Sequence, residues 1–209
     1  MKIGIIGSGN MGGGLGRIWA KKGHEVTFSY SRNQEKLAGL SASAPNARAG
    51  SPAEAARAEV ILLAVRWPDL PDALQQAGSL AGKIVIDCTN PLKPDMSGLE
   101  IGYTTSAAEE IAKMAPEAKV VKAFNTAFAQ VYEEPSRLFG SRRASMLYCG
   151  DDAAAKTAVA KLISDVGFDA VDCGPLSAAR LLEPVAMLVI TLGYGMKMGT
   201  NMALDLIRR

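Results

Sequence analysis

Three glycines near the amino terminus have the spacing of a phosphate-binding loop. The run Gly7-Ser8-Gly9-Asn10-Met11-Gly12 follows a short apolar segment and opens an amphipathic one. In such a loop the first glycine permits a tight turn, the second lets the backbone approach a pyrophosphate, and the third lets the helix pack closely on the strand. Amides at the start of the helix then point at the anion, aided by the helix dipole. The spacing and its context predict a dinucleotide site.

The residues after the next apolar run indicate which dinucleotide would bind. Enzymes that use NAD commonly place an acidic residue about 20 residues further on, where it accepts a hydrogen bond from the ribose 2′-OH. Here that region reads Ser29-Tyr30-Ser31-Arg32-Asn33, which contains no carboxylate. A guanidinium and hydroxyl groups would attract a 2′-phosphate that an acid would repel. Ser29, Ser31 and Arg32 are therefore predicted to favour NADP(H), the alternative being that Arg32 is an ordinary solvated side chain.

Polar residues also follow three later apolar runs, where ligands bind in open parallel sheets. The residues expected to contact the cofactor there are Ala64, Val65, Arg66 and Asn90. Those expected to position the reacting groups are Asn90, Pro91, Asn125 and Thr126. These ends are expected to carry no lysine, histidine or carboxylate that could move a proton, as the oxidation of an alcohol requires. The pattern favours hydride transfer to a flavin-like ring, which can proceed by positioning alone.

The remaining residues with reactive side chains favour structural roles. His24, the single histidine, precedes the second apolar run, and we expect it to be structural. Cys88, Cys149 and Cys173 lie far apart, with no spacing typical of a metal site. We predict no metal, and free thiols in a reducing, cytoplasmic compartment.

The elements that would position these residues alternate as in a parallel sheet covered by helices. Strands are expected over 2–6, 25–30, 60–65, 84–87, 120–124, 146–149 and 168–172. Helices are expected over 10–22, after a capping box of Ser106 and Glu109, and after Asp151 or Asp152. The stretch 41–52 is predicted to be a surface loop, and one Gly- and Met-rich helical region is expected from Ser177 to the C-terminus.

The predicted fold is α/β, a doubly wound parallel sheet of the Rossmann type over residues 1–143. A small C-terminal α/β portion over 144–209 is expected to pack on it and to end in the long helical region. The polar loop 93–105 either covers a second substrate or only connects two elements. The methionines and glycines of the C-terminal region favour helix packing or a subunit interface over a shelf for a ring.

The composition excludes several classes of partner. With 209 residues, a formal net charge of +2, 48% hydrophobic residues and 21% charged residues, the chain is typical of a soluble globular protein. The charge is too small for nucleic-acid binding. The most apolar later stretch, 185–192, is shorter than the roughly 20 residues that a membrane span needs. We expect a small-molecule redox partner, and neither a nucleic acid nor a membrane.

Several motifs resemble those of one family over essentially the whole chain. They are the glycine loop and Ser31-Arg32, followed by GYTTSAAE (102–109), KAFNT (122–126), CGDD (149–152) and CGPLSAARLLE (173–183). The chain resembles the NADPH-dependent reductases of the deazaflavin coenzyme F420, a family similar to the cytosolic domain of the six-transmembrane metalloreductases. The resemblance implies a homodimer, and hydride transfer between NADP(H) and F420 or a flavin such as FMN or FAD.

The same resemblance assigns residues to the cofactor. It places the pyrophosphate and the 2′-phosphate at Ser8, Gly9, Asn10, Met11, Ser31 and Arg32. Asn125 departs from the pattern, because the archaeal deazaflavin enzymes are expected to carry histidine there, whereas the metalloreductases share the Asn-Thr pair. The acceptor therefore stays open among F420, FMN, FAD and ferric chelates.

Two other functions remain to be weighed. A non-catalytic NADP(H)-binding sensor or scaffold would share the glycine loop and would also lack proton-transferring side chains. A dehydrogenase of the β-hydroxyacid type would share the N-terminus but adds a large helical domain with a catalytic lysine. About sixty residues follow the sixth expected strand, which leaves too little room for such a domain.

Overall fold

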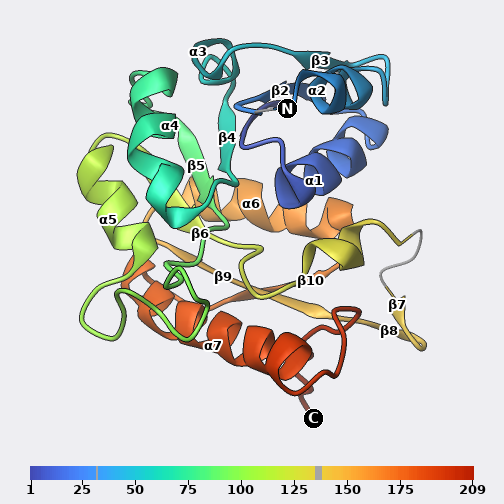
Figure 1. Ribbon diagram of the computed structural model, residues 1–209, viewed down its shortest axis with the longest axis vertical. Helices are drawn as coiled ribbons and strands as arrows, with labels where there is room; N and C mark the ends of the chain where they lie inside the picture. Colours follow the sequence, from blue (N-terminus) through green and yellow to red (C-terminus); the bar gives the residue numbers. More distant parts are fainter. Residues whose placement is uncertain (32, 135–137) are drawn as a thin grey trace.

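One twisted sheet of eight strands runs through the molecule (Figure 1). The computed structural model describes residues 1–31, 33–134 and 138–209. The strands lie side by side in the order β10-β9-β6-β5-β4-β1-β2-β3. They span β1 (Lys2–Ile6), β2 (Glu25–Ser29), β3 (Ala47–Ala49), β4 (Val60–Leu63), β5 (Ile84–Asp87), β6 (Lys119–Lys122), β9 (Ser145–Gly150) and β10 (Asp169–Asp172). A separate hairpin is formed by β7 (Leu138–Phe139) and β8 (Arg142–Arg143).

The sheet is parallel except at one junction. Strands β1 to β6 all pair in parallel register, and β9 then runs antiparallel to β6, with Val121 opposite Gly150. Strand β10 returns to a parallel pairing with β9. Because β1, β2, β4, β5 and β6 point the same way, their carboxyl ends meet at one edge of the sheet. The predicted α/β fold of the Rossmann type is confirmed.

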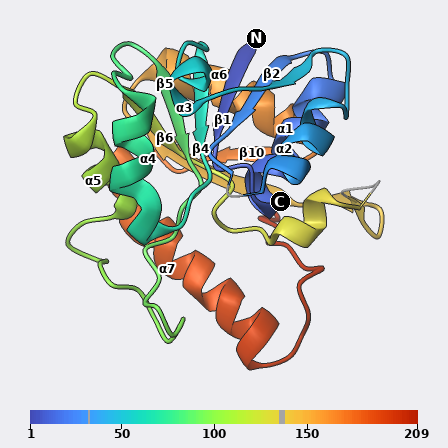
Figure 2. The same cartoon turned by 45° about the horizontal axis from the view of Figure 1, so that its top comes forward.

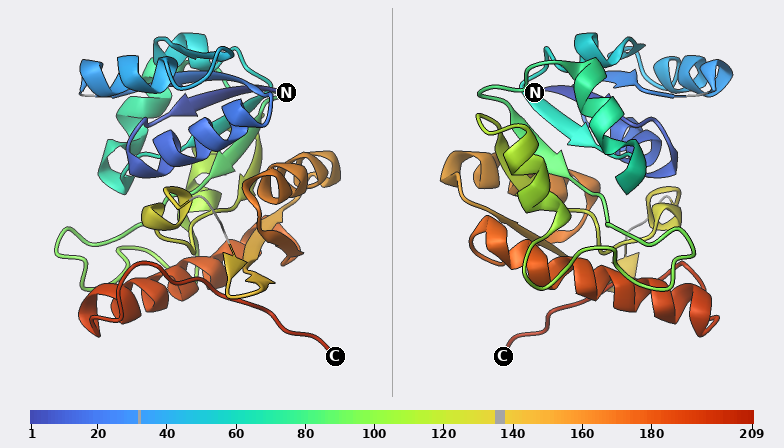
Figure 3. Two further views of the ribbon diagram at one scale, coloured as in Figure 1. Left: turned by 90° about the vertical axis from the view of Figure 1, so that its right-hand side faces the viewer. Right: turned by 60° about the vertical axis from the view of Figure 1, so that its left-hand side comes forward.

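Helices cover both faces of this sheet, as Figures 2 and 3 show. Their buried side chains form two cores, one on each face. The first core holds α1 (Asn10–Lys21), α2 (Gln34–Ser41) and α6 (Ala153–Val166), with Trp19, Phe28 and Phe124 among its largest buried side chains. The second core holds α3 (Pro52–Ala55), α4 (Leu70–Ala77), α5 (Ala107–Met114) and α7 (Ala179–Ile190).

Helices α5 and α6 begin at the predicted capping residues, but Glu109 has a different hydrogen-bond partner from the one expected. Asp152 caps α6 by accepting from the amide of Ala155, whereas Asp151 accepts from the amide of Leu176. Ser106 caps α5 by accepting from the amide of Glu109, as expected. The Glu109 carboxylate does not return to the Ser106 amide but accepts from the Ser106 hydroxyl, and it binds Arg180 of α7 through both of its oxygens. This carboxylate joins two helices instead of closing a capping box.

Two predictions about irregular segments need correction. The stretch 41–52 is not merely a surface loop, because β3 lies within it and pairs with β2, and because Ser51 caps α3 in a complete capping box. The C-terminal helical region is present but ends early: α7 continues into a π-helical turn, Thr191–Gly195, and the chain beyond it is not helical. Residues near the end instead bind the start of β9, where the Ser145 amide donates to the Leu204 carbonyl.

The C-terminal portion continues the same sheet, since β9 pairs directly with β6. The boundary expected between two portions of the chain at residue 143 therefore stays a prediction, because the sheet continues from β6 to β9 without a break. Helix α7 lies along this part of the sheet (Figure 1).

The segment Leu176–Gly195 has 20 residues and a mean hydropathy of 1.5, which is enough to cross a membrane by length and composition. Leu182, Ala186 and Val189 on one side of this segment are buried, whereas Leu181, Leu188 and Tyr194 are exposed.

Candidate active site

The glycine loop lies at the carboxyl end of β1, and two of its glycines are required by packing. Gly7 has a φ of +105°, and a Cβ built on it would lie 2.4 Å from the carbonyl oxygen of Ala64, at the end of β4. A Cβ on Gly12 would lie 2.1 Å from the carbonyl oxygen of Gly7. A side chain at either position would push the turn or helix α1 off the sheet. The loop thereby brings together the predicted residues Gly7, Gly12, Ala64 and Val65.

Gly9 is different, because a Cβ built on it would meet no atom within 4 Å. Gly9 is the N-cap of α1, and among the described residues no side chain caps this helix and none in its first turn is acidic. Gly9 and Asn10 are exposed, and Met11 packs partly into the first core. A helix start with uncapped amides and open space beside it is a site for an anion. The geometry therefore fits a pyrophosphate.

The serine hydroxyls predicted to bind the phosphates of the cofactor differ in their accessibility. Ser29 is fully buried and donates to the Ile5 carbonyl, while Ser8 is buried and donates to the Ser29 carbonyl. Ser31 is half-exposed, and its hydroxyl closes a short turn with Asn33. Of the three serines, Ser31 alone presents a side chain near the surface. Arg32 lies outside the described residues.

A second cation near the loop was missed by the sequence prediction. Lys36, in the first turn of α2, donates to the Asn10 side chain at 2.9 Å. Asn33 caps α2 by accepting from the Lys36 amide, which fixes the start of this helix next to the loop. The signal was available in the sequence, because a lysine one helical turn after an Asn cap must lie beside that cap. Arg66, by contrast, is exposed and paired with Asp69 at 2.8 Å.

The ends of β5 and β6 bring two predicted amides together. Asn90 donates to the backbone carbonyl of Asn125, and the Asn125 amide donates to Asn90 Oδ1 and to the Leu182 carbonyl of α7. Asn125 is only 5% exposed, and its Oδ1 atom has no hydrogen-bond partner among the described residues. An unpaired buried acceptor costs free energy, so a ligand that donates a hydrogen bond there would be stabilised. Thr126 is also buried, and its hydroxyl contacts the sulfur of Met146.

A small, mainly apolar cavity of about 160 Å³ opens beside these amides. Its lining includes Asn90, Asn125, Phe128, Met96 from the loop 93–105, and Val189 and Tyr194 from the C-terminal helical region. Phe128 and Tyr194 meet edge to face with ring centres 5.3 Å apart. The cavity is smaller than the ~300–1,000 Å³ of most ligand pockets, so it would hold one edge of a planar ring. Both the loop and the C-terminal region contribute to this site, while Pro91 is buried beneath it.

The prediction that these strand ends carry no lysine or carboxylate is wrong. Asp87 is the last residue of β5 and Lys122 the last of β6, and both are fully buried. The Lys122 ammonium group lies 2.8 Å from Asp87 Oδ2 and 2.7 Å from Oε1 of Glu183, a buried residue of α7. In the sequence, Asp87 and Lys122 lie within expected apolar strands, and Glu183 lies within the expected C-terminal helical region. Their pairing depends on a tertiary contact across 61 positions, which no local pattern reveals.

The surroundings of Lys122 and Glu183 shift the pKa values of both groups. Burial alone would lower the pKa of Lys122, but the carboxylates of Asp87 and Glu183 outweigh it and raise that pKa above its ordinary value. Burial raises the pKa of Glu183, and Lys122 opposes this shift only in part. Lys122 therefore stays protonated at neutral pH. All three of its N–H groups are in use, the third donating to the Thr89 carbonyl at 2.6 Å.

The other reactive residues have structural surroundings. His24 is buried and bridges the amino-terminal nitrogen and Asp165 of α6. All three cysteines are free thiols, and burial raises the pKa values of Cys88 and Cys149 to about 12, so neither is a nucleophile at neutral pH. Among the described residues, no group of three or more histidines, cysteines or carboxylates could hold a metal ion.

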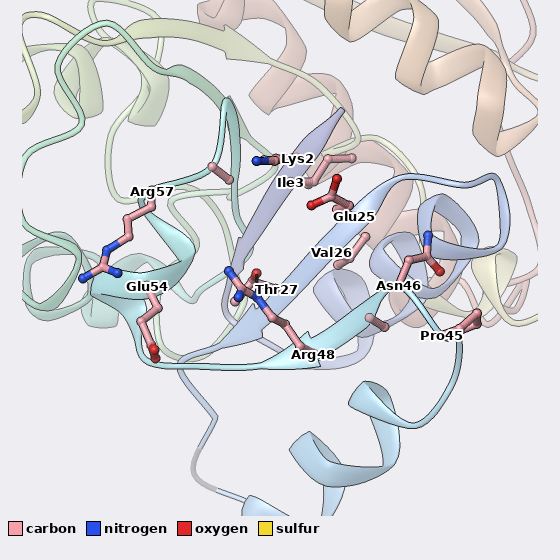
Figure 4. A pocket seen from close by; sticks show the side chains of 12 residues that line it. Lys2, Ile3, Glu25, Val26, Thr27, Pro45, Asn46, Arg48, Glu54 and Arg57 are labelled. Carbon is pink, nitrogen blue, oxygen red and sulfur yellow. Dashed lines mark hydrogen bonds between the residues drawn. The ribbon is translucent and has the colours of Figure 1, made fainter.

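A larger cavity of about 390 Å³ lies beside the amino-terminal parts of β1, β2 and β3 (Figure 4). It mixes the cations Lys2, Arg48 and Arg57 with the carboxylates of Glu25 and Glu54. Ligands of open α/β sheets bind at the opposite, carboxyl edge. The glycine loop and the asparagine pair share that opposite edge, so we take it as the candidate active site.

Comparisons with known proteins identify the family of this chain. Residues 2–91 match the family model described as NADP oxidoreductase, coenzyme F420-dependent. The chain is 31% identical to the F420-dependent NADP reductase of Methanothermobacter thermautotrophicus, over 92% of this chain and 89% of that protein. It is 33% identical to the metalloreductase STEAP3 of Rattus norvegicus, over 89% of this chain but only 36% of that longer protein. A crystal structure of a candidate F420-dependent NADP reductase from Arthrobacter sp. FB24 is 32% identical and superposes with a TM-score of 0.88 over all of both chains.

Proposed function

The chain belongs to the family of coenzyme F420-dependent NADP oxidoreductases, and from that premise we propose that it transfers a hydride between NADP(H) and a deazaflavin or flavin. Its class is therefore that of an NADP-dependent oxidoreductase. One observation carries the proposal for the second substrate. The open helix start at Gly9 and the cavity at Asn125 share one edge of the sheet, as two reacting rings held side by side would require.

The NADP(H) end of the site rests on an anion cradle and nearby cations. The pyrophosphate would lie in the space beside Gly9, against the amides of Asn10 and Met11. The 2′-phosphate would lie near Ser31, Lys36 and, by its sequence position, Arg32. Ser8 and Ser29 would contribute through their backbone, because their hydroxyls are buried and already donate to carbonyls. Ala64, Val65 and Arg66 would flank the ribose side of the cofactor.

The reacting end rests on the asparagine pair. When bound, NADPH supplies the hydride, and a deazaflavin or flavin ring receives it together with a proton from water. Asn90, Pro91, Asn125 and Thr126 would orient the two rings, and Asn125 Oδ1 would accept from an N–H of a ligand. Lys122 would not deliver the proton, because it is fully buried and its three N–H groups are already donated within the protein. This arrangement does not favour the β-hydroxyacid dehydrogenase alternative, which needs a lysine open to its substrate.

The experiment follows NADPH oxidation with F420, FMN, FAD and ferric citrate offered separately as acceptors. We expect turnover with a deazaflavin or flavin, and a strong preference for NADPH over NADH. Micromolar NADPH binding measured by calorimetry, with no turnover for any acceptor, would instead identify a sensor or scaffold. Turnover with the ferric chelate alone would show that the acceptor of this chain resembles that of the metalloreductases.

Two features support a proposed homodimer in the cytoplasm. The outer side of α7 and the residues after it expose Leu181, Leu188, Tyr194, Met196 and Met198. An exposed apolar strip of this kind is typical of a subunit interface. The three cysteines are free, which suits a reducing compartment. Light scattering coupled to gel filtration should give a mass near 44 kDa, about twice the chain's 21.9 kDa.

A further inference from the structure

The buried charges and the asparagine pair form two adjoining layers at the same strand ends. Asp87, Lys122 and Glu183 make the charged layer. Asn90, Asn125 and the Leu182 carbonyl make the amide layer, which borders the cavity. Each member of the charged layer lies within three positions of a member of the amide layer on the same segment. A change in the charged layer therefore reaches the amide layer through very short stretches of chain.

The first of these stretches is fixed by Thr89. Its amide and its hydroxyl both donate to Asp87 Oδ1, at 2.8 and 2.7 Å. Its carbonyl accepts from the Lys122 ammonium group at 2.6 Å. All three polar groups of Thr89 are thus held by the charged layer. Because Asn90 is the next residue, its direction toward Asn125 is set by these contacts.

The second stretch runs from Lys122 to Asn125 through an unusual backbone turn. Phe124 is fully buried and has a φ of +65°, a conformation that a bulky residue adopts only when its surroundings impose it. This turn directs the buried Asn125 amide toward Asn90 and the Leu182 carbonyl. The buried Phe124 ring, edge to face with Trp19 at 5.7 Å, anchors one side of the turn. Lys122 anchors the other.

The third stretch connects the cavity to two helices. Glu183 accepts from Lys122 and also from the amides of Ala107 and Ala108, at the start of α5. Its neighbour Leu182 supplies the carbonyl that Asn125 binds. Helix α7 therefore keeps its place beside the asparagine pair through one buried carboxylate. The glycine loop shares no hydrogen bond with this network among those in the described part of the chain.

We propose that Lys122 is a positioning residue that holds the Asn90–Asn125 pair in place against α7. This inference rests on the proposed function, because it assumes that Asn90 and Asn125 orient the acceptor. Removing the ammonium group would leave two carboxylates facing each other in the interior, and they would separate, take up a proton or admit water. The Thr89 carbonyl would lose its donor at the same time. The acceptor side of the site would then loosen while the anion cradle at Gly9 keeps its geometry.

The test compares Lys122→Met with Lys119→Met, which removes the same charge from the other end of the same strand. Lys119 is half-exposed and pairs with Asp152, far from the asparagine pair. We expect Lys122→Met to lower kcat/KM for the acceptor by about 100-fold, the scale of a 1 Å misplacement. Its dissociation constant for NADPH should stay within about twofold of the wild type, since the NADPH cradle is formed elsewhere. Lys119→Met should leave both quantities unchanged.

A second readout does not depend on turnover, and so separates this proposal from the proposed function. In protein labelled with [15N]asparagine, the side-chain amides of Asn90 and Asn125 should give shifted, slowly exchanging NMR signals in the wild type. In Lys122→Met these signals should move toward random-coil positions and exchange faster. If no acceptor is turned over, the NMR comparison still decides the role of Lys122.

Glu183→Gln covers the case in which Lys122→Met fails to fold. Glutamine keeps one acceptor for Lys122 and removes one charge, so both readouts should change in the same direction but less. Folded variants with wild-type asparagine signals and wild-type acceptor kinetics would overturn the proposal. Equal losses of NADPH and acceptor binding, with a lowered melting temperature, would also overturn it, because they would indicate a purely structural role.

Discussion

The two halves of the candidate site are built in opposite ways. The cradle for the cofactor's phosphates comes from one continuous turn and one helix start, and it recognises its ligand through the backbone. The acceptor side is assembled from β5, β6 and α7, and it depends on three buried charges and a strained turn at Phe124. The first half is local, with its exposed cations close by in the sequence, whereas the second is long-range and depends on buried ion pairs. This difference predicts that substitutions will separate the two binding functions cleanly.

The largest effect should come from filling the cradle. Gly9→Val would place a side chain in the open space that we assign to the pyrophosphate, so binding of NADPH and NADH should both be lost. The fold should survive, because no protein atom lies within 4 Å of the new Cβ. Gly39→Val is the matched control, since its Cβ would also enter open space, but in α2. Calorimetry measures NADPH binding by each variant, and a thermal melt shows whether the variant is folded. A folded Gly9→Val that still binds NADPH would refute the assignment of this space to the pyrophosphate.

The next effect should concern the choice of dinucleotide. Arg32→Ala and Lys36→Ala should each weaken NADPH binding by about 10- to 100-fold, the loss expected for a charge-assisted hydrogen bond, and should hardly change NADH binding. Lys161→Ala, which removes an exposed lysine of α6 paired with Asp165, serves as the control. Dissociation constants for both dinucleotides decide the matter. Equal losses for NADPH and NADH would show that the 2′-phosphate lies elsewhere.

A smaller effect is expected on the acceptor side. Asn125→Leu keeps the volume but removes the unpaired Oδ1 and the amide that binds Asn90 and Leu182. We expect the KM for the acceptor to rise about 10-fold, with little change in NADPH affinity, because one or two hydrogen bonds are lost. Steady-state kinetics at saturating NADPH measure this effect. A rise in the NADPH dissociation constant instead would assign Asn125 to the nicotinamide.

This contrast also explains what could be predicted from the sequence. The Rossmann-type sheet, the strand over 2–6 and the roles of Gly7 and Gly12 follow from local periodicity and spacing, and the structure has the sheet and both close approaches. Asp87 was overlooked because it ends an expected apolar strand, and Lys122 because it lies inside the strand expected over 120–124. The pairing of Lys122 with Asp87, 35 positions before it, and with Glu183, 61 positions beyond it, exists only in three dimensions. The short β3 was missed because its three residues, Ala47–Ala49, are too few to show a periodic pattern.

The smallest effect should concern two ionic contacts that hold α7 at different depths, one to Glu109 of α5 and one to Lys122 of β6. Glu109 pairs with Arg180 nearer the surface, and the hydrogen bond from Arg180 lowers the pKa of Glu109 below its ordinary value of 4.5. A lowered pKa stabilises the fold above 4.5, and this contribution is lost as the pH falls through the lowered value. Lys122 behaves in the opposite sense. Its raised pKa contributes stability fully below 10.5, and that contribution disappears as the pH rises through the raised value.

Melting temperatures of Glu109→Gln and the wild type should therefore differ by about 2–4 °C at pH 7, typical of one partly exposed pair. They should converge as the pH falls through the lowered pKa of Glu109. Adding 0.5 M salt should shrink the Glu109 difference, because exposed charges are screened. The corresponding difference for Lys122→Met should be larger and insensitive to salt, because Lys122 and both of its carboxylate partners are fully buried. If salt weakened both contacts equally, the charged layer beneath the asparagine pair would have to be open to water, and the ionic half of the site would be no more rigid than the surface.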